Sequence, residues 1–142
     1  MSGNRKFVDT NVLVYAYDAT AGDKHDRARV LLEELWHTRE GCLSIQVLQE
    51  FFVTTTRKIP KPLAAPAAAQ IVADLARWHV HAPAARDVVA AIGIHQRTEA
   101  SFWDAMIIRS AQELGCRTLY SEDLSPGQVY AGVQVSNPFP SR

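Results

Sequence analysis

The chain is organised around the stretch Lys6-Phe7-Val8-Asp9-Thr10-Asn11, which continues into the apolar run Val12-Leu13-Val14-Tyr15-Ala16. Its first apolar residues predict a short buried strand over 6–8, and the run after Asn11 predicts a helix over 11–17. A lone carboxylate at the end of a buried strand is costly to desolvate unless it is paired or holds a cation. In open α/β sheets, ligands bind outside the carboxyl ends of the strands, and Asp9 is expected there.

Length and composition favour one globular domain over residues 1–142. A chain of 142 residues can bury a sizeable core, and 47% of them are hydrophobic. Fifteen basic and fifteen acidic residues give a formal net charge of zero, so a polyanion site requires a local basic patch or a bound cation. Cys42 and Cys116 form no C-x-x-C pair and are predicted to be small buried thiols in a reducing compartment. Without a signal-like or membrane-length apolar run, we expect a cytoplasmic protein with no membrane contact.

Short apolar runs alternate with helical patterns along the chain. Strands are predicted at 6–8, 42–45, 79–81, 118–120 and 133–135. Helices are predicted at 11–17, 23–40, from Ser44 or Gln46 to a frayed end at 54–56, and at 66–75, 85–96 and 101–114. The Pro/Ala-rich segment 60–66 reads as a connector and not a domain boundary. This alternation predicts an α/β fold, a single three-layer domain with a mostly parallel sheet and helices on both faces.

Four acidic residues stand apart from the others. Asp9 follows Phe-Val, Glu50 lies in Val-Leu-Gln-Glu-Phe-Phe-Val, and Asp104 lies in Phe-Trp-Asp-Ala-Met-Ile-Ile. Asp123 joins them by position, because it follows the strand at 118–120 as Asp9 follows the strand at 6–8. These strand ends and the N-terminal halves of two helices can meet at the carboxyl edge of the sheet. The remaining acidic residues, Asp87 among them, are interpreted as helix caps or solvated groups.

The chemistry of such a cluster limits what it can do. Several neighbouring carboxylates cannot all stay ionised without shared protons or a cation. Oxygen ligands with no His or Cys cluster suit Mg²⁺ or Mn²⁺, and such a site can activate water and bind the oxygens of a phosphodiester. The residues alone leave a second interpretation open, in which Glu50 and Asp104 form structural pairs with Arg side chains.

The same motifs resemble those of a known family. Phe-Val-Asp9-Thr-Asn11-Val-Leu, Leu-Gln-Glu50-Phe, Phe-Trp-Asp104-Ala and Ser121-Glu-Asp123-Leu are similar, in this order, to the signature of PIN-domain nucleases. More narrowly, the chain resembles the ribonuclease toxins of VapBC toxin–antitoxin pairs, and its tail Leu-Ser-Pro-Gly-Gln128…Gly132-Val…Asn137-Pro-Phe fits that group. Each motif is weak alone, but four in order over residues 6–139 are specific.

The resemblance implies a five-stranded sheet and endonucleolytic cutting of RNA that leaves a 5′-phosphate and a 3′-hydroxyl. It implies that Asp9, Glu50, Asp104 and Asp123 hold Mg²⁺ or Mn²⁺, with Asn11 and Ser121 in support. Ser121 stands where the family often has Thr, and either residue supplies a hydroxyl. A cognate antitoxin and a second copy of the chain are the implied partners. The alternative is an inactive PIN-like module that binds RNA or protein without cutting.

Other functional interpretations have less support in the sequence. Asp9-Thr10-Asn11 lacks the second Asp that an aspartate-nucleophile phosphatase needs as its acid and base. No G-x-G-x-x-G or Walker sequence is present. The three Trp residues are expected in the core or an interface and not as base-stacking platforms. The basic residues near the connector, Arg57, Lys58 and Lys61, are either solvated or in contact with phosphate.

Overall fold

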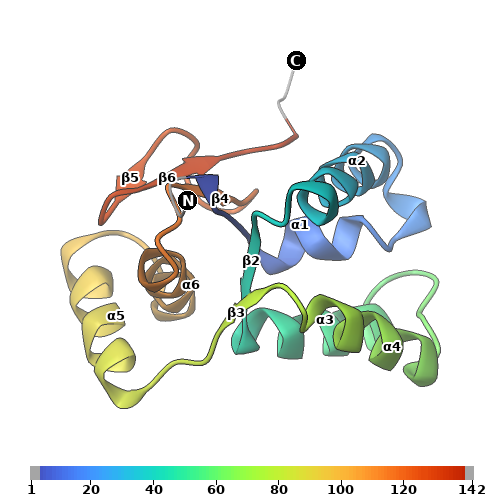
Figure 1. The fold of residues 1–142 in the computed structure, drawn as a ribbon, viewed down its shortest axis with the longest axis horizontal. Helices are drawn as coiled ribbons and strands as arrows, with labels where there is room; N and C mark the ends of the chain where they lie inside the picture. The colour runs from blue at the N-terminus through green and yellow to red at the C-terminus, as the bar shows by residue number, and fades with distance from the viewer. Residues whose placement is uncertain (1–3, 140–142) are drawn as a thin grey trace.

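The computed structural model describes residues 4–139, and a six-stranded sheet lies at its centre (Figure 1). The sheet order is β3-β2-β1-β4-β6-β5. Its strands are β1 (Lys6–Val8), β2 (Gly41–Ser44), β3 (His79–His81), β4 (Thr118–Tyr120), β5 (Val129–Tyr130) and β6 (Val133–Ser136). The strands from β3 to β6 pair in parallel, whereas β5 pairs antiparallel with β6.

The predicted mostly parallel sheet is confirmed, with one strand more than the five expected. The additional strand is β5, which has only two residues and is therefore too short to show an alternating pattern. It joins β6 through Ala131 and Gly132, whose φ values of 52° and 85° make the tight reversal.

Within residues 4–139, seven helical segments surround the sheet. They are α1 (Thr10–Tyr15), the 3₁₀ turn η2 (Ala19–Ala21), α2 (Asp23–Thr38), α3 (Ile45–Arg57), α4 (Ala65–Leu75), α5 (Ala85–Arg97) and α6 (Phe102–Glu113). Figure 1 shows α1 to α4 on one side of the sheet and α5 and α6 on the other. None of the described helices is long and apolar enough to cross a membrane.

The order of the strands explains why the helices divide in this way. The chain moves from β1 to β2 to β3 in one direction and then returns past β1 to β4. Because crossovers between parallel strands are right-handed, a reversal of direction places the following helices on the opposite face. The reversal falls between the adjacent strands β1 and β4, and ligands in this class of fold bind beside the carboxyl ends of the strands at such a switch point.

The core is formed by the apolar strand residues and the inward faces of the helices. Phe7, Leu43 and Leu119 on the strands are buried together with Leu13 and Phe51 on α1 and α3. Cys42 and Cys116 are buried free thiols, as predicted. The expected connector at 60–66 runs from the end of α3 into α4, and Pro66 lies in the first turn of α4.

The predicted fraying of α3 at residues 54–56 is wrong. The helix continues to Arg57 because two of the threonines bond to the preceding turn. The Thr55 hydroxyl donates to the Phe51 carbonyl at 2.8 Å, and that of Thr56 donates to the Phe52 carbonyl at 2.7 Å. Burial of Thr55 also supports this turn, so tertiary packing outweighs the low helix propensity of Thr.

The sequence of α5 predicts an apolar face at Ala85, Val88, Val89 and Ile92, and this prediction is wrong. Val88, Val89 and Ile92 are exposed, with Val89 at 69%. The buried positions of the helix are instead Asp87, Ala91 and Ile94, because this side meets α6. Phe52 on α3 and Trp36 on α2 are likewise more exposed than predicted, although Trp36 packs edge-to-face on Trp78.

Candidate active site

Asp9 is fixed where β1 passes into α1. Its main-chain N–H donates to the Tyr120 carbonyl at 2.9 Å, which continues the pairing of β1 with β4. Its carboxylate accepts from the Thr10 N–H at 2.7 Å, as the N-cap of α1, and from the Ser121 hydroxyl at 2.8 Å. Asp9 is only 6% exposed. The strand end therefore holds this carboxylate in one orientation in a largely desolvated place.

Glu50 is held by side chains of two helices. It accepts a hydrogen bond from the Thr10 hydroxyl at 2.6 Å and one from the Gln46 amide at 3.2 Å. The Gln46 amide also donates to the Trp103 carbonyl at 3.3 Å. These contacts connect α3 with the first turns of α1 and α6, where Asp9 and Asp104 lie.

Asp104 and Asp123 complete the cluster from α6 and from the segment after β4. The N–H of Asp104 donates to the Ser101 hydroxyl at 3.1 Å, so the N-cap places Asp104 in the first turn of α6. Asp123 lies two residues beyond Ser121, in the turn that follows β4. Glu122 has other partners, because it accepts from the Tyr15 hydroxyl at 2.7 Å and pairs with Lys24.

The four predicted acidic residues meet in one cleft. Asp9, Glu50, Asp104 and Asp123 all line a hollow of about 540 Å³, and Asn11 lines it with them. Ser121 is not part of the lining. It is fully buried and bears on the site through its hydrogen bond to Asp9. The carboxyl ends of β1 and β4 thus bring together residues that are far apart in the sequence.

Burial and mutual repulsion alter the acidity of this cluster. Burial raises the pKa of Asp9 to about 6, against the opposing effect of its hydrogen bonds from Ser121 and Thr10. The charges of Asp104 and Asp123 raise this pKa further. Burial also raises the pKa of Asp104, and the charges of Asp123 and Glu50 add to that rise. The negative charge of the cluster is therefore poorly compensated by the protein itself.

The cluster suits a hard divalent cation. Among residues 4–139, none of the four carboxylates pairs with an Arg or Lys, so the structural Arg pairs considered for Glu50 and Asp104 do not form. The donor set consists of carboxylate oxygens, as Mg²⁺ and Mn²⁺ prefer. The Asn11 amide is buried at this cleft with neither its oxygen nor its nitrogen hydrogen-bonded. An unsatisfied amide here fits a place for a ligand or its bound water.

Three residues of the cleft were not identified from the sequence: Thr10 and Gln46, which orient Glu50, and Trp103. Lys58, one of the basic residues considered for phosphate contact, also lines the cleft. A signal existed for Gln46, which precedes Glu50 by one helical turn and so shares its face. Trp103 was expected in the core or an interface, but it is 64% exposed at the cleft.

Comparison with known proteins identifies the family to which this fold belongs. The PIN domain profile matches residues 6–130. The chain belongs to the PIN domain family. No curated protein sequence matches it.

Solved structures share the fold of this PIN domain. One is Mycobacterium tuberculosis VapC20, described as a sarcin-ricin-loop-cleaving toxin, with 22% identity and a TM-score of 0.59 over 83% of this chain and 89% of that one. Another is DNA-bound VapBC from Salmonella typhimurium, with 18% identity and a TM-score of 0.66 over 96% of this chain and 99% of that one. At this level of identity the likeness concerns the fold.

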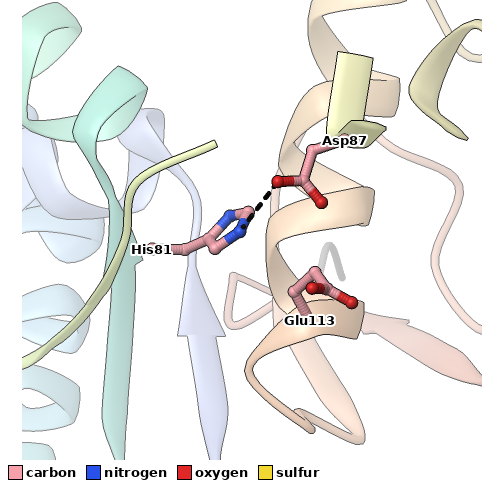
Figure 2. Close-up of side chains that lie close together, drawn as sticks. All are labelled: His81, Asp87 and Glu113. Atoms are coloured by element: carbon pink, nitrogen blue, oxygen red, sulfur yellow. Dashed lines mark ion pairs between the residues drawn. The ribbon is translucent and has the colours of Figure 1, made fainter. Parts of the chain in front are cut away.

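A second polar cluster of the PIN domain lies away from the predicted site. His81, Asp87 and Glu113 place ligand atoms within 4.8 Å of one another, a spacing that would allow a metal ion (Figure 2). The Arg109 guanidinium already contacts both carboxylates, with Nε 2.9 Å from Asp87 and a terminal nitrogen 3.2 Å from Glu113. His81 contacts the Ser110 hydroxyl at 2.9 Å and lies 3.4 Å from Asp87. We interpret this cluster as an ion-pair network that joins β3, α5 and α6.

Proposed function

We propose that residues 1–142 form a single nuclease domain that hydrolyses RNA phosphodiester bonds endonucleolytically with Mg²⁺ or Mn²⁺. The observation that carries the proposal is the convergence of Asp9, Glu50, Asp104 and Asp123 in one cleft, where no Lys or Arg of residues 4–139 forms an ion pair with them. Membership of the PIN domain family supports the same reaction class.

Each polar residue of the cleft would have its own role in binding the cation or the substrate. Asp9 and Glu50, oriented by the hydroxyls of Ser121 and Thr10, would hold the cation together with Asp104 and Asp123. Asn11 would hydrogen-bond to substrate or to ordered water, since its amide lacks a protein partner. When bound, a divalent ion lowers the pKa of the water that it coordinates and offsets the charge of the phosphodiester. The cost of keeping Asp9 buried beside neighbouring carboxylates argues against the alternative of an inactive binding module.

The test is cleavage of RNA by the purified protein with Mn²⁺, with Mg²⁺ and with EDTA. We expect internal cuts that require metal and leave 5′-phosphate ends. Asp104→Asn is the matched loss-of-function variant, and Asp26→Asn, in the first turn of α2 and outside the cleft, is the control that should cut like the wild type. RNA that is bound but not cut under every metal condition would favour the inactive module.

In the cell, we propose that the protein is the cytoplasmic toxin of a toxin–antitoxin pair, and that a cognate antitoxin covers its active site. The fold likeness to VapC20 and to a VapBC complex supports this role. A small antitoxin-like reading frame directly beside the gene, whose product suppresses cleavage on co-purification, is the expected observation.

We also propose a homodimer, which the resemblance implies, although the aromatic residues near the N-terminal helices do not supply its interface. Tyr15 and Tyr17 pack within the chain against Phe139 and Phe51, so they do not offer a free aromatic surface. Six of the larger exposed apolar side chains instead lie on α3 and α5, among them Val53 and Val89. We expect sedimentation of a dimer at micromolar concentration; a monomer alone would remove this part of the proposal.

A further inference from the structure

A second cleft adjoins the candidate active site. It has a volume of about 360 Å³ and is lined on one side by the end of α5 and on the other by the segment after β4, including Arg97, Ser125 and Gln128. Only Asp104 and Asp123 line both clefts. The acidic cluster therefore lies at a junction, and a linear ligand whose reacting group sits there has space to continue in both directions.

The first cleft offers an aromatic surface and a cation. Trp103 precedes Asp104 and is 64% exposed, although its neighbour Phe102 packs against it edge-to-face. Lys58, at the C-cap of α3, lines the same cleft and forms no ion pair with any residue in the described range. An exposed indole in the wall of a cleft offers a flat apolar face on which a ligand can stack.

The second cleft offers a cation of its own. Arg97 ends α5, and within residues 4–139 its guanidinium has no acidic partner. The side chain folds back over Gly93, where a Cβ atom would lie 3.0 Å from a terminal guanidinium nitrogen. Gly93 thus leaves room for Arg97 against its own helix, beside the cleft that it lines.

These groups match the chemistry of an unpaired nucleic acid strand. Exposed aromatic rings stack on bases whatever their sequence, and Lys and Arg contact phosphates. Stacking on Trp103 requires a base that is free of its own helix. Because the protein has no net charge, local cations on either side of the acids are needed to hold an anionic strand.

We propose that the two clefts form one path for single-stranded RNA across the acidic cluster. Trp103 stacks on an unpaired base, and Lys58 contacts a phosphate, on one side of the scissile bond. Arg97 contacts a phosphate on the other side. This inference rests on the proposed ribonuclease activity and specifies how its substrate is bound.

The first test measures binding of a labelled single-stranded RNA by fluorescence anisotropy, in the Asp9→Asn background with Mg²⁺. Trp103→Ala should weaken binding about tenfold or more, whereas Trp103→Phe, which keeps an aromatic ring, should recover most of the affinity. Trp36→Ala is the matched control, because Trp36 is a partly exposed indole that lies outside both clefts. Melting temperatures of all variants report their folding.

The second test separates the two sides of the path. Lys58→Gln and Arg97→Gln should each lower the slope of log affinity against log salt by about one, while Lys61→Gln and Arg77→Gln should leave it unchanged. When the RNA is truncated on one side of the mapped cleavage site, Arg97→Gln should no longer weaken its binding, while Trp103→Ala and Lys58→Gln still should. RNA truncated on the other side should lose its sensitivity to Trp103→Ala and Lys58→Gln only.

These experiments distinguish failure of the proposed RNA path from failure of the proposed cleavage reaction. If the wild type cuts RNA but Trp103→Ala binds and cuts as well as the wild type, the path is wrong and the reaction stands. Equal affinity for duplex RNA, or loss of both sensitivities on the same truncation, also overturns the path. RNA binding that depends on Trp103 and Arg97, without cutting in Mn²⁺, would support the path and reject the reaction.

Discussion

Asp9 shows how one position can be costly for folding and useful for function. Its carboxylate is buried at the end of β1, and its pKa rises to about 6 even though two hydrogen bonds oppose that rise. The charges of Asp104 and Asp123 add to the cost of ionising it. A side chain kept under these conditions without a cationic partner is a candidate for binding a cation.

Replacement of Asp9 by Asn should abolish cleavage and leave the fold as stable as before or more stable. Asn keeps the shape but removes the charge that attracts a divalent cation, so we expect the rate to fall by about a thousandfold or more. Stability should not fall, because one source of repulsion in the metal-free cluster disappears. Cleavage rate and melting temperature are measured on the same sample. Cutting at near wild-type rate with metal present would contradict the assignment of Asp9 as a ligand.

The raised pKa of Asp9 also predicts how stability changes with pH. Because the folded-state pKa of about 6 exceeds the model-peptide value of 3.8, the metal-free native protein binds more protons than the unfolded chain between these values. Stability from this group is therefore greatest near pH 4 and falls as the pH rises through 6, by up to about 3 kcal/mol. The raised pKa of Asp104 acts in the same direction.

Urea unfolding in EDTA between pH 4 and 7.5 measures this effect. The informative quantity is the difference between the wild type and Asp9→Asn, since other titrating groups contribute to both. We expect the variant to gain stability relative to the wild type as the pH rises. A difference that does not change with pH would show that Asp9 has an ordinary pKa.

Among the secondary-structure elements, α5 and α6 are joined by an ion pair that could not be predicted from their sequences. Asp87 is buried, accepts from the Ala84 N–H at 2.8 Å at the start of α5, and pairs with Arg109 of α6. The Ala84 hydrogen bond, followed by Arg109 and His81, lowers the pKa of Asp87. Its stabilisation is therefore present above the ordinary Asp pKa and is lost as the pH falls through the lowered value.

Asp87→Asn should destabilise the protein by about 3 kcal/mol, because it leaves the mostly buried Arg109 without its main charge partner. The matched control is Glu113→Gln, which removes the more exposed carboxylate on the same guanidinium and should cost less than about 1 kcal/mol. Chemical denaturation at pH 7 compares the two. Equal losses would mean that the contact is not governed by burial.

For the molecule as a whole, the direction in which the chain crosses the sheet creates the site. The chain reverses its direction across the sheet between β3 and β4, and all four acidic residues converge at the carboxyl ends of the adjacent strands β1 and β4. Each acidic residue comes from a different segment, so the cluster exists only in the folded chain. A cation that binds it will therefore stabilise the native state selectively.

Millimolar Mn²⁺ should raise the melting temperature of the EDTA-treated protein by several degrees. Binding at a hundredfold excess over the dissociation constant contributes about 2.7 kcal/mol, and a domain of this size gains roughly 3 °C or more per kcal/mol. Asp104→Asn should show a much smaller rise, which separates the acidic cluster from other cation contacts. An equal rise in both proteins would assign the effect elsewhere, with the His81, Asp87 and Glu113 group as the next place to examine.

Much of this architecture can be predicted from short stretches of the sequence. Short apolar runs alternating with helical patterns are sufficient to predict the parallel sheet, because each depends on neighbours in the chain. Asp9, Glu50 and Asp104 could be singled out because each is a carboxylate surrounded by apolar residues in the sequence. Asp123 followed from its place after a strand, since parallel strands share a carboxyl edge.

Other features depend on contacts between distant segments and could not be predicted in this way. The buried face of α5 contains Asp87 and not Val89, because Arg109, 22 residues away, supplies the matching charge. Trp103 has the apolar neighbours of a core residue, yet it is exposed because its side of α6 faces a cleft and not another element. Periodicity shows that a helix has two faces, but only the packing of the folded chain decides which face meets the protein and which remains free to bind a ligand.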